Sequence, residues 1–183
     1  RGSLLGLLVC AAVARADVII VDPAGGGDFT TVQAAIDAAA NGDTLLVRGD
    51  TLTEVLELNG KALAIVGDIP VGSTTRRDVG CIAVRNLAAG QQVILRNLAF
   101  EGDFQFPTYD NLSGIFLADN EGSVWIENCS TSGRDGSGQS NCGCFSPGEI
   151  PTGKGISINN CLAVTIVGST LQGGDGGNAI IFC

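Results

Sequence analysis

The segment Val124–Gly136, with the sequence VWIENCSTSGRDG, recurs further along the chain as VTIVGSTLQGGDG at Val164–Gly176. A weaker third copy, VILRNLAFEGD at Val93–Asp103, precedes both. Each copy combines a short β-branched strand, a polar corner and a glycine-rich exit. Repeats of this kind are typical of solenoids, in which each unit buries its apolar face only against the next.

The composition favours many short strands over a helical bundle. Of the 183 residues, 45% are apolar but only 5% are aromatic, and 27 are glycine. A chain of this length fits one domain of ordinary size. Short apolar runs between glycine-rich turns predict strands at 18–21, 44–48, 55–58, 62–66, 81–84, 93–95, 114–117, 124–126, 156–158 and 164–167. The turns that follow 117 and 158 match in position but differ in length by one residue.

One amphipathic helix is expected near the N-terminus. Thr30 and Gln33 have capping-box spacing, and Asn41-Gly42 supplies a stop signal. A single apolar stripe at helical spacing joins Val32, Ala35, Ile36 and Ala39.

The sequence around this helix is similar to a known superfamily. GDFTTVQAAIDAA at Gly27–Ala39, followed by GDTLLV at Gly42–Val47, resembles the opening of pectinesterases and of other pectin-lyase-like proteins. The match covers about residues 18–68, and the repeat pattern carries it further. The resemblance implies an all-β fold, a right-handed single-stranded parallel β-helix, with a short N-terminal helix that caps the coil.

The first sixteen residues resemble a signal peptide. Arg1 precedes an apolar run from Leu4 to Ala14, and Ala14-Arg15-Ala16 has the small-x-small pattern of a cleavage site. The run is too short to cross a bilayer, and no later segment is a candidate span. A buried first helix and a lipid anchor at Cys10 are the alternatives. We therefore expect a secreted or cell-surface protein, with residues 17–183 forming the N-terminal part of a β-helix domain that continues beyond the sequence.

Charge narrows the range of partners. Ten basic residues stand against nineteen acidic ones, for a formal charge of −9, which argues against nucleic acid as a partner. An acidic or neutral polysaccharide is the expected ligand, and a polyanionic one would need calcium as a bridge. The chain contains no histidine, which excludes Ser-His-Asp hydrolysis and histidine-dependent acid–base catalysis.

The six cysteines outside the expected signal peptide suit disulfide bonds in an exported protein, with the connectivity left open. A zinc site at Cys142 and Cys144 is the alternative use of that pair.

Calcium is the cofactor that the repeat suggests. Asp135 and Asp175 occupy equivalent positions of two copies, so stacking in register would bring them about 4.8 Å apart, where a cation relieves their repulsion. The sequence GGDGGNAI around Asp175 and Asn178 also resembles a calcium-binding nonapeptide repeat. The alternative is that these residues only shape glycine-rich turns.

Two aromatic residues are the candidates for contact with a sugar. Strand alternation places Val124 and Ile126 on one face and Trp125 on the other, where an exposed indole stacks on a pyranose ring. Tyr109, in an aromatic loop, is assigned to the same surface. The alternative for Trp125 is partial burial under the insertion at 131–153. Asn86, Asn97 and Asn128 are interpreted as structural corner residues that adopt left-handed backbone conformations and stack along the solenoid axis.

Three functions remain open from the sequence. The favoured one is an exported or cell-surface β-helix protein, non-catalytic in this region, that binds polysaccharide or serves in adhesion. The second is a polysaccharide lyase or carbohydrate esterase, acting on a pectin-type substrate, whose catalytic rungs lie beyond residue 183. The third is a structural spacer. The catalytic motifs of pectinesterases and polygalacturonases are missing from this sequence, so the resemblance supplies no catalytic residue.

Overall fold

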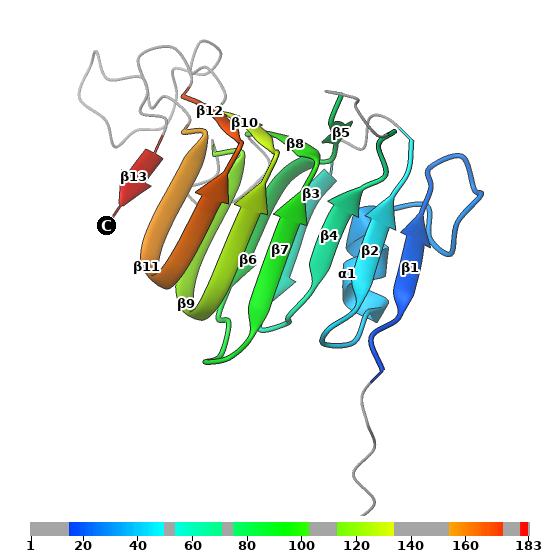
Figure 1. Ribbon diagram of the computed structural model, residues 1–183, viewed down its shortest axis with the longest axis horizontal. Coiled ribbons are helices and arrows are strands. Elements are labelled where there is room, and N and C mark those ends of the chain that lie inside the picture. The colour runs from blue at the N-terminus through cyan, green and yellow to red at the C-terminus, as the bar shows by residue number, and fades with distance from the viewer. Residues whose placement is uncertain are drawn as a thin grey trace, which may run out of the picture.

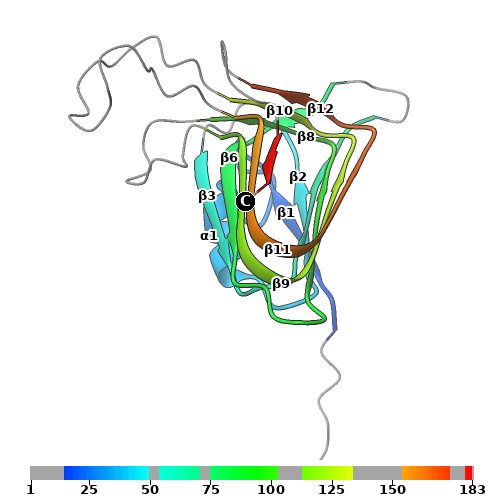
Figure 2. The same cartoon turned by 90° about the vertical axis from the view of Figure 1, so that its left-hand side faces the viewer.

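The computed structural model describes residues 15–49, 54–70, 75–102, 113–133, 154–173 and the backbone of 180–182. These residues form a mainly β structure with one short helix. All strand pairs are parallel, and the larger sheet has nine strands and the smaller one four. The larger sheet is strongly curled, so that its two sides face each other across a common interior (Figures 1 and 2).

The elements follow one another in the order β1 (Val18–Val21), α1 (Val32–Ala38), β2 (Thr44–Val47), β3 (Glu54–Asn59), β4 (Ala64–Gly67), β5 (Arg77–Asp78), β6 (Gly80–Arg85), β7 (Gln92–Arg96), β8 (Leu98–Glu101), β9 (Ile115–Glu127), β10 (Ser130–Ser132), β11 (Ile156–Val167), β12 (Thr170–Gln172) and β13 (Ile180–Phe182).

The strands stack into three parallel ladders. The first contains β1, β2, β4, β7 and the second halves of β9 and β11. The second contains β5, β8, β10 and β12, and the third contains β3, β6, the first halves of β9 and β11, and β13. From β4 onward the chain passes through the first, second and third ladders in that order, again and again.

The strand register confirms the alignment of the repeats. Val124 pairs with Val164 of the later copy and with Val93 of the earlier one. Partners in the first halves of β9 and β11, such as Ile115 and Ile156, are one position further apart in the sequence than Val124 and Val164. A bulge between Cys161 and Ala163 absorbs the difference, which is the one-residue variation expected from the sequence.

The separate strands expected at 114–117 and 124–126 are one strand, so the turn expected between them is wrong. Asp119 adopts a φ of 53°, which bends the backbone sharply within β9. β9 remains paired with β11 both before and after this residue. The strands expected at 156–158 and 164–167 merge into β11 in the same way, with Asn160 at a φ of 48°. The short strands β5, β8, β10 and β12 were not expected from the sequence.

Inward-facing aliphatic residues form the core in continuous rows. In the first ladder, one row of register partners is fully buried and consists of Leu45, Ile65, Leu95 and Ile126. In the third ladder, the corresponding row consists of Leu56, Ile82, Ile115 and Ile156. Burial of each such side chain contributes about 1.5–3 kcal/mol, so the stacked rows hold the ladders together.

The helix α1 packs against β1, β2 and β3 at one end of this core. The expected apolar stripe is confirmed, because Val32, Ala35, Ile36 and Ala39 are all buried. The expected capping box is wrong. Thr31, not Thr30, is the N-cap, and its hydroxyl accepts a hydrogen bond from Ala34 N at 3.4 Å.

The first turn of α1 is held instead by a carboxylate from a distant strand. Glu54 of β3 accepts from Val32 N at 2.8 Å and from Gln33 N at 3.0 Å. This carboxylate satisfies two amide groups that a helix start leaves without intrahelical partners. In the described part of the chain, no helix has the length and hydropathy needed to cross a membrane.

Candidate functional site: an exposed strip on the outer face

Part of the outward-facing surface of the first ladder is continuous from β1 to β11, and we call this part the outer strip. It consists of two rows of register partners, each crossing six strands from β1 to β11. One row contains Val18, Thr44, Ala64, Ile94, Trp125 and Thr165, and the other contains Ile20, Leu46, Val66, Arg96, Glu127 and Val167.

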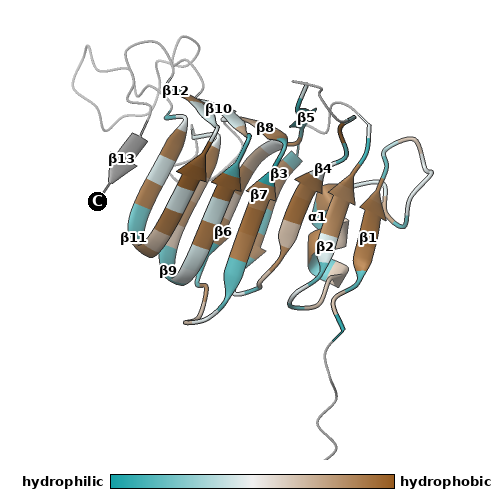
Figure 3. Ribbon diagram, in the orientation of Figure 1, coloured by the Kyte–Doolittle hydropathy of each residue, from teal (hydrophilic) through white to brown (hydrophobic). Residues whose placement is uncertain are grey.

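The outer strip is more apolar than a solvated sheet face usually is. In a sheet that has one face on the core and the other in solvent, apolar inward-facing residues normally alternate with polar outward-facing residues along each strand. Here β1, β2 and β4 are apolar along nearly their whole length (Figure 3). The exposed fractions are 64% for Val18, 44% for Val167 and 36% for Trp125. This face therefore presents aliphatic and aromatic side chains to solvent.

Trp125 has the outward orientation that strand alternation predicts. Its neighbours Val124 and Ile126 are 1% and 0% exposed and lie in the core. The indole Nε1 donates a hydrogen bond to Oε2 of Glu127 at 3.3 Å. Trp125 is therefore anchored at its polar edge and keeps part of its ring surface open to solvent.

Arg96 completes this arrangement from the neighbouring strand β7. Its Nε and Nη2 atoms donate to Glu127 Oε2 at 3.0 and 2.7 Å. Among the described residues, Oε1 of Glu127 accepts no hydrogen bond. The ion pair is about half exposed and contributes less than about 1 kcal/mol to stability, so its main effect is to orient the carboxylate and balance its charge.

Sequence reasoning identified Trp125 but missed Glu127 and Arg96. A signal for both was present in the repeat. Glu127 is two residues after Trp125 and so lies on the same face of the strand. Arg96 precedes Glu127 by the same offset that separates Val93 from Val124, and this offset places the two in register.

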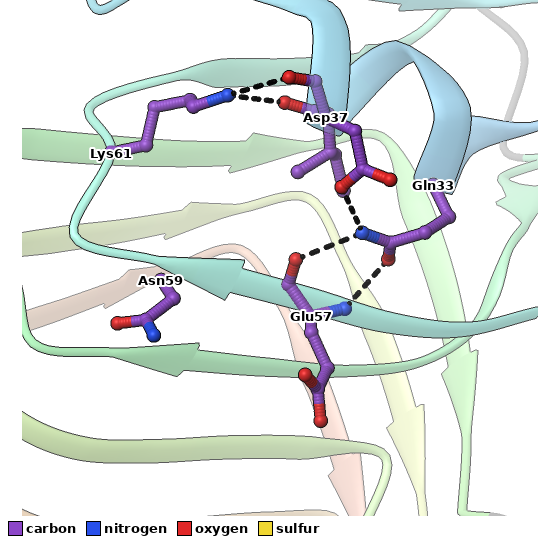
Figure 4. Close-up of a pocket in the computed structure, with 6 residues that line it drawn as sticks. Gln33, Asp37, Glu57, Asn59 and Lys61 are labelled. Atoms are coloured by element: carbon purple, nitrogen blue, oxygen red, sulfur yellow. Dashed lines mark hydrogen bonds between the residues drawn. The ribbon is translucent and has the colours of Figure 1, made fainter.

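A second candidate is a shallow cavity of about 210 Å³ between α1 and β3 (Figure 4). Gln33 donates to Asp37 Oδ1 at 2.8 Å and to the carbonyl of Glu57 at 3.2 Å, and it accepts from Glu57 N at 2.8 Å. Lys61 donates to the carbonyls of Ile36 and Asp37 at 2.7 and 3.2 Å. These mutual bonds fasten the helix to the sheet, and they explain the polar lining without a ligand.

The expected metal ligands Asp135, Asp175 and Asn178 lie outside the described residues, as does Tyr109. Within the described ranges, no three His, Cys, Asp or Glu side chains are grouped so as to hold a metal ion. The register that would align the two aspartates extends to the pair Ser132 and Gln172. Calcium binding stays a prediction.

The structural interpretation of the asparagines is confirmed. Asn86, Asn97 and Asn128 have φ values of 56°, 59° and 50°. Asn128 donates from Nδ2 to Asn97 Oδ1 at 2.8 Å, and Asn86 donates in the same way to Asn59 Oδ1 at 2.8 Å.

The sequence interpretation missed two corner residues and one arginine. Asn160 donates to Asp119 Oδ1 at 2.9 Å and extends the corner that contains Asn86. Arg76 donates to the carbonyl of Asn128 at 2.8 Å and to its Oδ1 at 3.2 Å. All these groups bond along the stacking direction, so they support the corners at which the chain turns.

Two of the described cysteines, Cys129 and Cys161, carry free thiols. Cys129 is completely buried, and burial raises the pKa of its thiol from 9.0 to about 11. Its Sγ lies 3.3 Å from the carbonyl oxygen of Glu127 and 3.4 Å from that of Leu95, and its single S–H group is shared between these two acceptors. A buried, protonated thiol of this kind packs as a small apolar group and is a poor nucleophile. Disulfide bonds and the zinc alternative at Cys142 and Cys144 stay predictions.

Comparison with protein-family models, with curated proteins and with solved structures finds no match to this chain. What the chain does is therefore inferred from the geometry of the outer strip.

Proposed function

We propose that this chain is an exported or cell-surface protein with a right-handed parallel β-helix that binds polysaccharide without transforming it. Three features support the fold: the repeated passage through three parallel ladders, the register that pairs equivalent positions of the three repeat copies, and α1 at one end of the core. The signal-peptide pattern of residues 1–16 supports export.

The observation that carries the binding function is the exposed indole of Trp125. Large aromatic side chains are usually buried, and an exposed one held at its polar edge provides a rigid apolar platform. Pyranose rings have apolar faces that stack on such platforms and hydroxyl groups that bond to nearby carboxylates. Trp125 and Glu127 supply both kinds of contact on one strand.

The second candidate is a polysaccharide lyase or carbohydrate esterase that acts on a pectin-type substrate through residues outside this sequence. The opening segment Gly27–Val47 favours it through its resemblance to pectinesterases. For that reason the test of binding includes a test of turnover.

The experiment is a glycan microarray of neutral and acidic polysaccharides, probed with the purified protein and with Trp125→Ala. Binding to at least one polysaccharide class, reduced by the substitution, is the expected result. Retained ligands are then incubated with the protein, and the release of reducing ends, unsaturated ends or methanol is measured. Retention of no polysaccharide would overturn the proposal, and product release would replace binding with the enzymatic alternative.

A further inference from the structure

The dimensions of the outer strip restrict what can occupy it. Six strands at a spacing of about 4.8 Å give a length of about 24 Å, and two rows along each strand give a width of about 7 Å. A stable protein partner needs about 800 Å² of surface on each side, several times what this strip offers. A narrow, extended surface fits a linear chain that runs across the strands, along the stacking axis.

The charge of the outer strip favours a neutral chain. Arg96 is its one cation, and the guanidinium donates through both Nε and Nη2 to Glu127, its one anion. The strip therefore has no net charge, while the whole chain carries −9. A polyanion would meet general repulsion from the protein and would find no unpaired cation on the strip.

The polar groups of the outer strip suit hydroxyl groups. Oε2 of Glu127 is occupied by Arg96 and Trp125, which leaves Oε1 as an oriented acceptor beside the indole. A carboxylate accepts strong hydrogen bonds from hydroxyl donors. Thr165 lies in register with Trp125 on the next strand, is exposed, and adds a hydroxyl group on that side.

From these observations we infer that the outer strip binds a single neutral polysaccharide chain laid across the strands. One pyranose ring stacks on Trp125 and donates a hydroxyl group to Glu127, and further rings cover Ile94, Val66 and Leu46. This inference rests on the proposed polysaccharide binding and specifies its surface and its class of ligand.

Affinity electrophoresis in gels that contain a soluble polysaccharide tests it. The neutral polymers are glucan, mannan, xylan and galactan, and the acidic one is polygalacturonate. The protein is compared with Trp125→Ala, with Trp125→Phe, which keeps an aromatic platform, and with Leu162→Ala. Leu162 is the matched control, because it is 80% exposed and lies off the strip.

We expect at least one neutral polymer to retard the protein. Trp125→Ala should weaken that binding at least tenfold, Trp125→Phe by less than about threefold, and Leu162→Ala should not change it. Binding should also be unaffected by raising the salt concentration, because no net charge is involved. Circular dichroism melting curves verify that each variant is folded.

Three other outcomes would overturn the inference, and the last of them would overturn the proposed function as well. Retardation by polygalacturonate alone overturns this inference and leaves the proposed glycan binding intact. Neutral binding that Trp125→Ala leaves unchanged places the ligand elsewhere, and it also overturns the inference alone. Retardation by none of the five polymers overturns both the inference and the proposed function.

Discussion

At the scale of single residues, the thiol of Cys129 makes stability depend on pH. Its pKa is raised from 9.0 to about 11 by burial, so the unfolded chain loses this proton at a lower pH than the folded one. The stabilising contribution is complete below pH 9 and is lost as the pH rises toward 11. We expect the free energy of unfolding to fall by about 1–3 kcal/mol over this range on account of Cys129.

Urea unfolding under reducing conditions, followed by the fluorescence of Trp125, measures this effect. Other groups titrate in the same range, so the quantity to compare is the difference between the native protein and Cys129→Ala at each pH. That difference should shrink from pH 9 to pH 11. A constant difference would contradict the raised pKa.

The corner residues show which side-chain interactions could be predicted from the sequence and which could not. Asn86, Asn97 and Asn128 were predictable, because asparagine tolerates positive φ and its amide both donates and accepts along a stack. The contact of Arg76 with Asn128 was not, because it joins residues 52 positions apart and depends on where the chain turns.

At the scale of elements, α1 is stabilised by a group that no local pattern contains. The sequence around Thr30 and Gln33 satisfies the capping-box spacing, yet the structure uses Thr31 together with the carboxylate of Glu54. The carboxylate of Glu54, which is 22 residues from Val32 in the sequence, accepts two hydrogen bonds of the first turn in place of a local side chain. It does so because folding brings its negative charge to the start of the helix.

We expect Glu54→Ala to lower the free energy of unfolding by about 1–2 kcal/mol, the usual loss for a helix cap. Glu57→Ala is the matched control, since Glu57 lies on the same strand, is exposed, and bonds to α1 through its backbone. It should change stability by less than about 0.5 kcal/mol. Chemical denaturation measures both variants, and equal losses would show that the carboxylate of Glu54 has no special role.

The strands β9 and β11 show why element boundaries were harder to predict than element types. Asp119-Asn120-Glu121-Gly122 has the composition of a turn and was expected to end a strand. β11 pairs with Asn120 inside this segment, while β6 pairs with β9 up to Ala118 and β7 pairs with it from Ser123 onward. The polar residues therefore bend the strand and do not terminate it. Asn120 is 2% exposed and donates to the carbonyl of Val84 at 3.0 Å, an interaction that only stacking supplies.

At the scale of the whole molecule, the internal repeat was the most reliable predictor. The spacing of its three copies predicted the register of β7, β9 and β11, because a stacked unit can bury its apolar row only in one alignment. The outer strip was not predicted, although the sequence contains every residue that forms it. Its existence depends on the register of six strands at once, from Val18 to Val167, and no single segment contains that information.

A surface assembled from six strands implies that affinity depends on ligand length. Longer chains of the neutral polysaccharide that is retained best should bind more tightly, from disaccharide through tetrasaccharide to hexasaccharide, as each added ring covers another apolar residue. Leu46 lies three strands from Trp125, or about 14 Å away. A hexasaccharide is long enough to reach from Trp125 to Leu46, and a disaccharide is not. Leu46→Ser should therefore weaken hexasaccharide binding about three- to tenfold and leave disaccharide binding unchanged. Isothermal titration calorimetry measures both affinities. An equal loss for both lengths, or an affinity that does not grow beyond the disaccharide, would confine the site to Trp125 and contradict a strip-long contact.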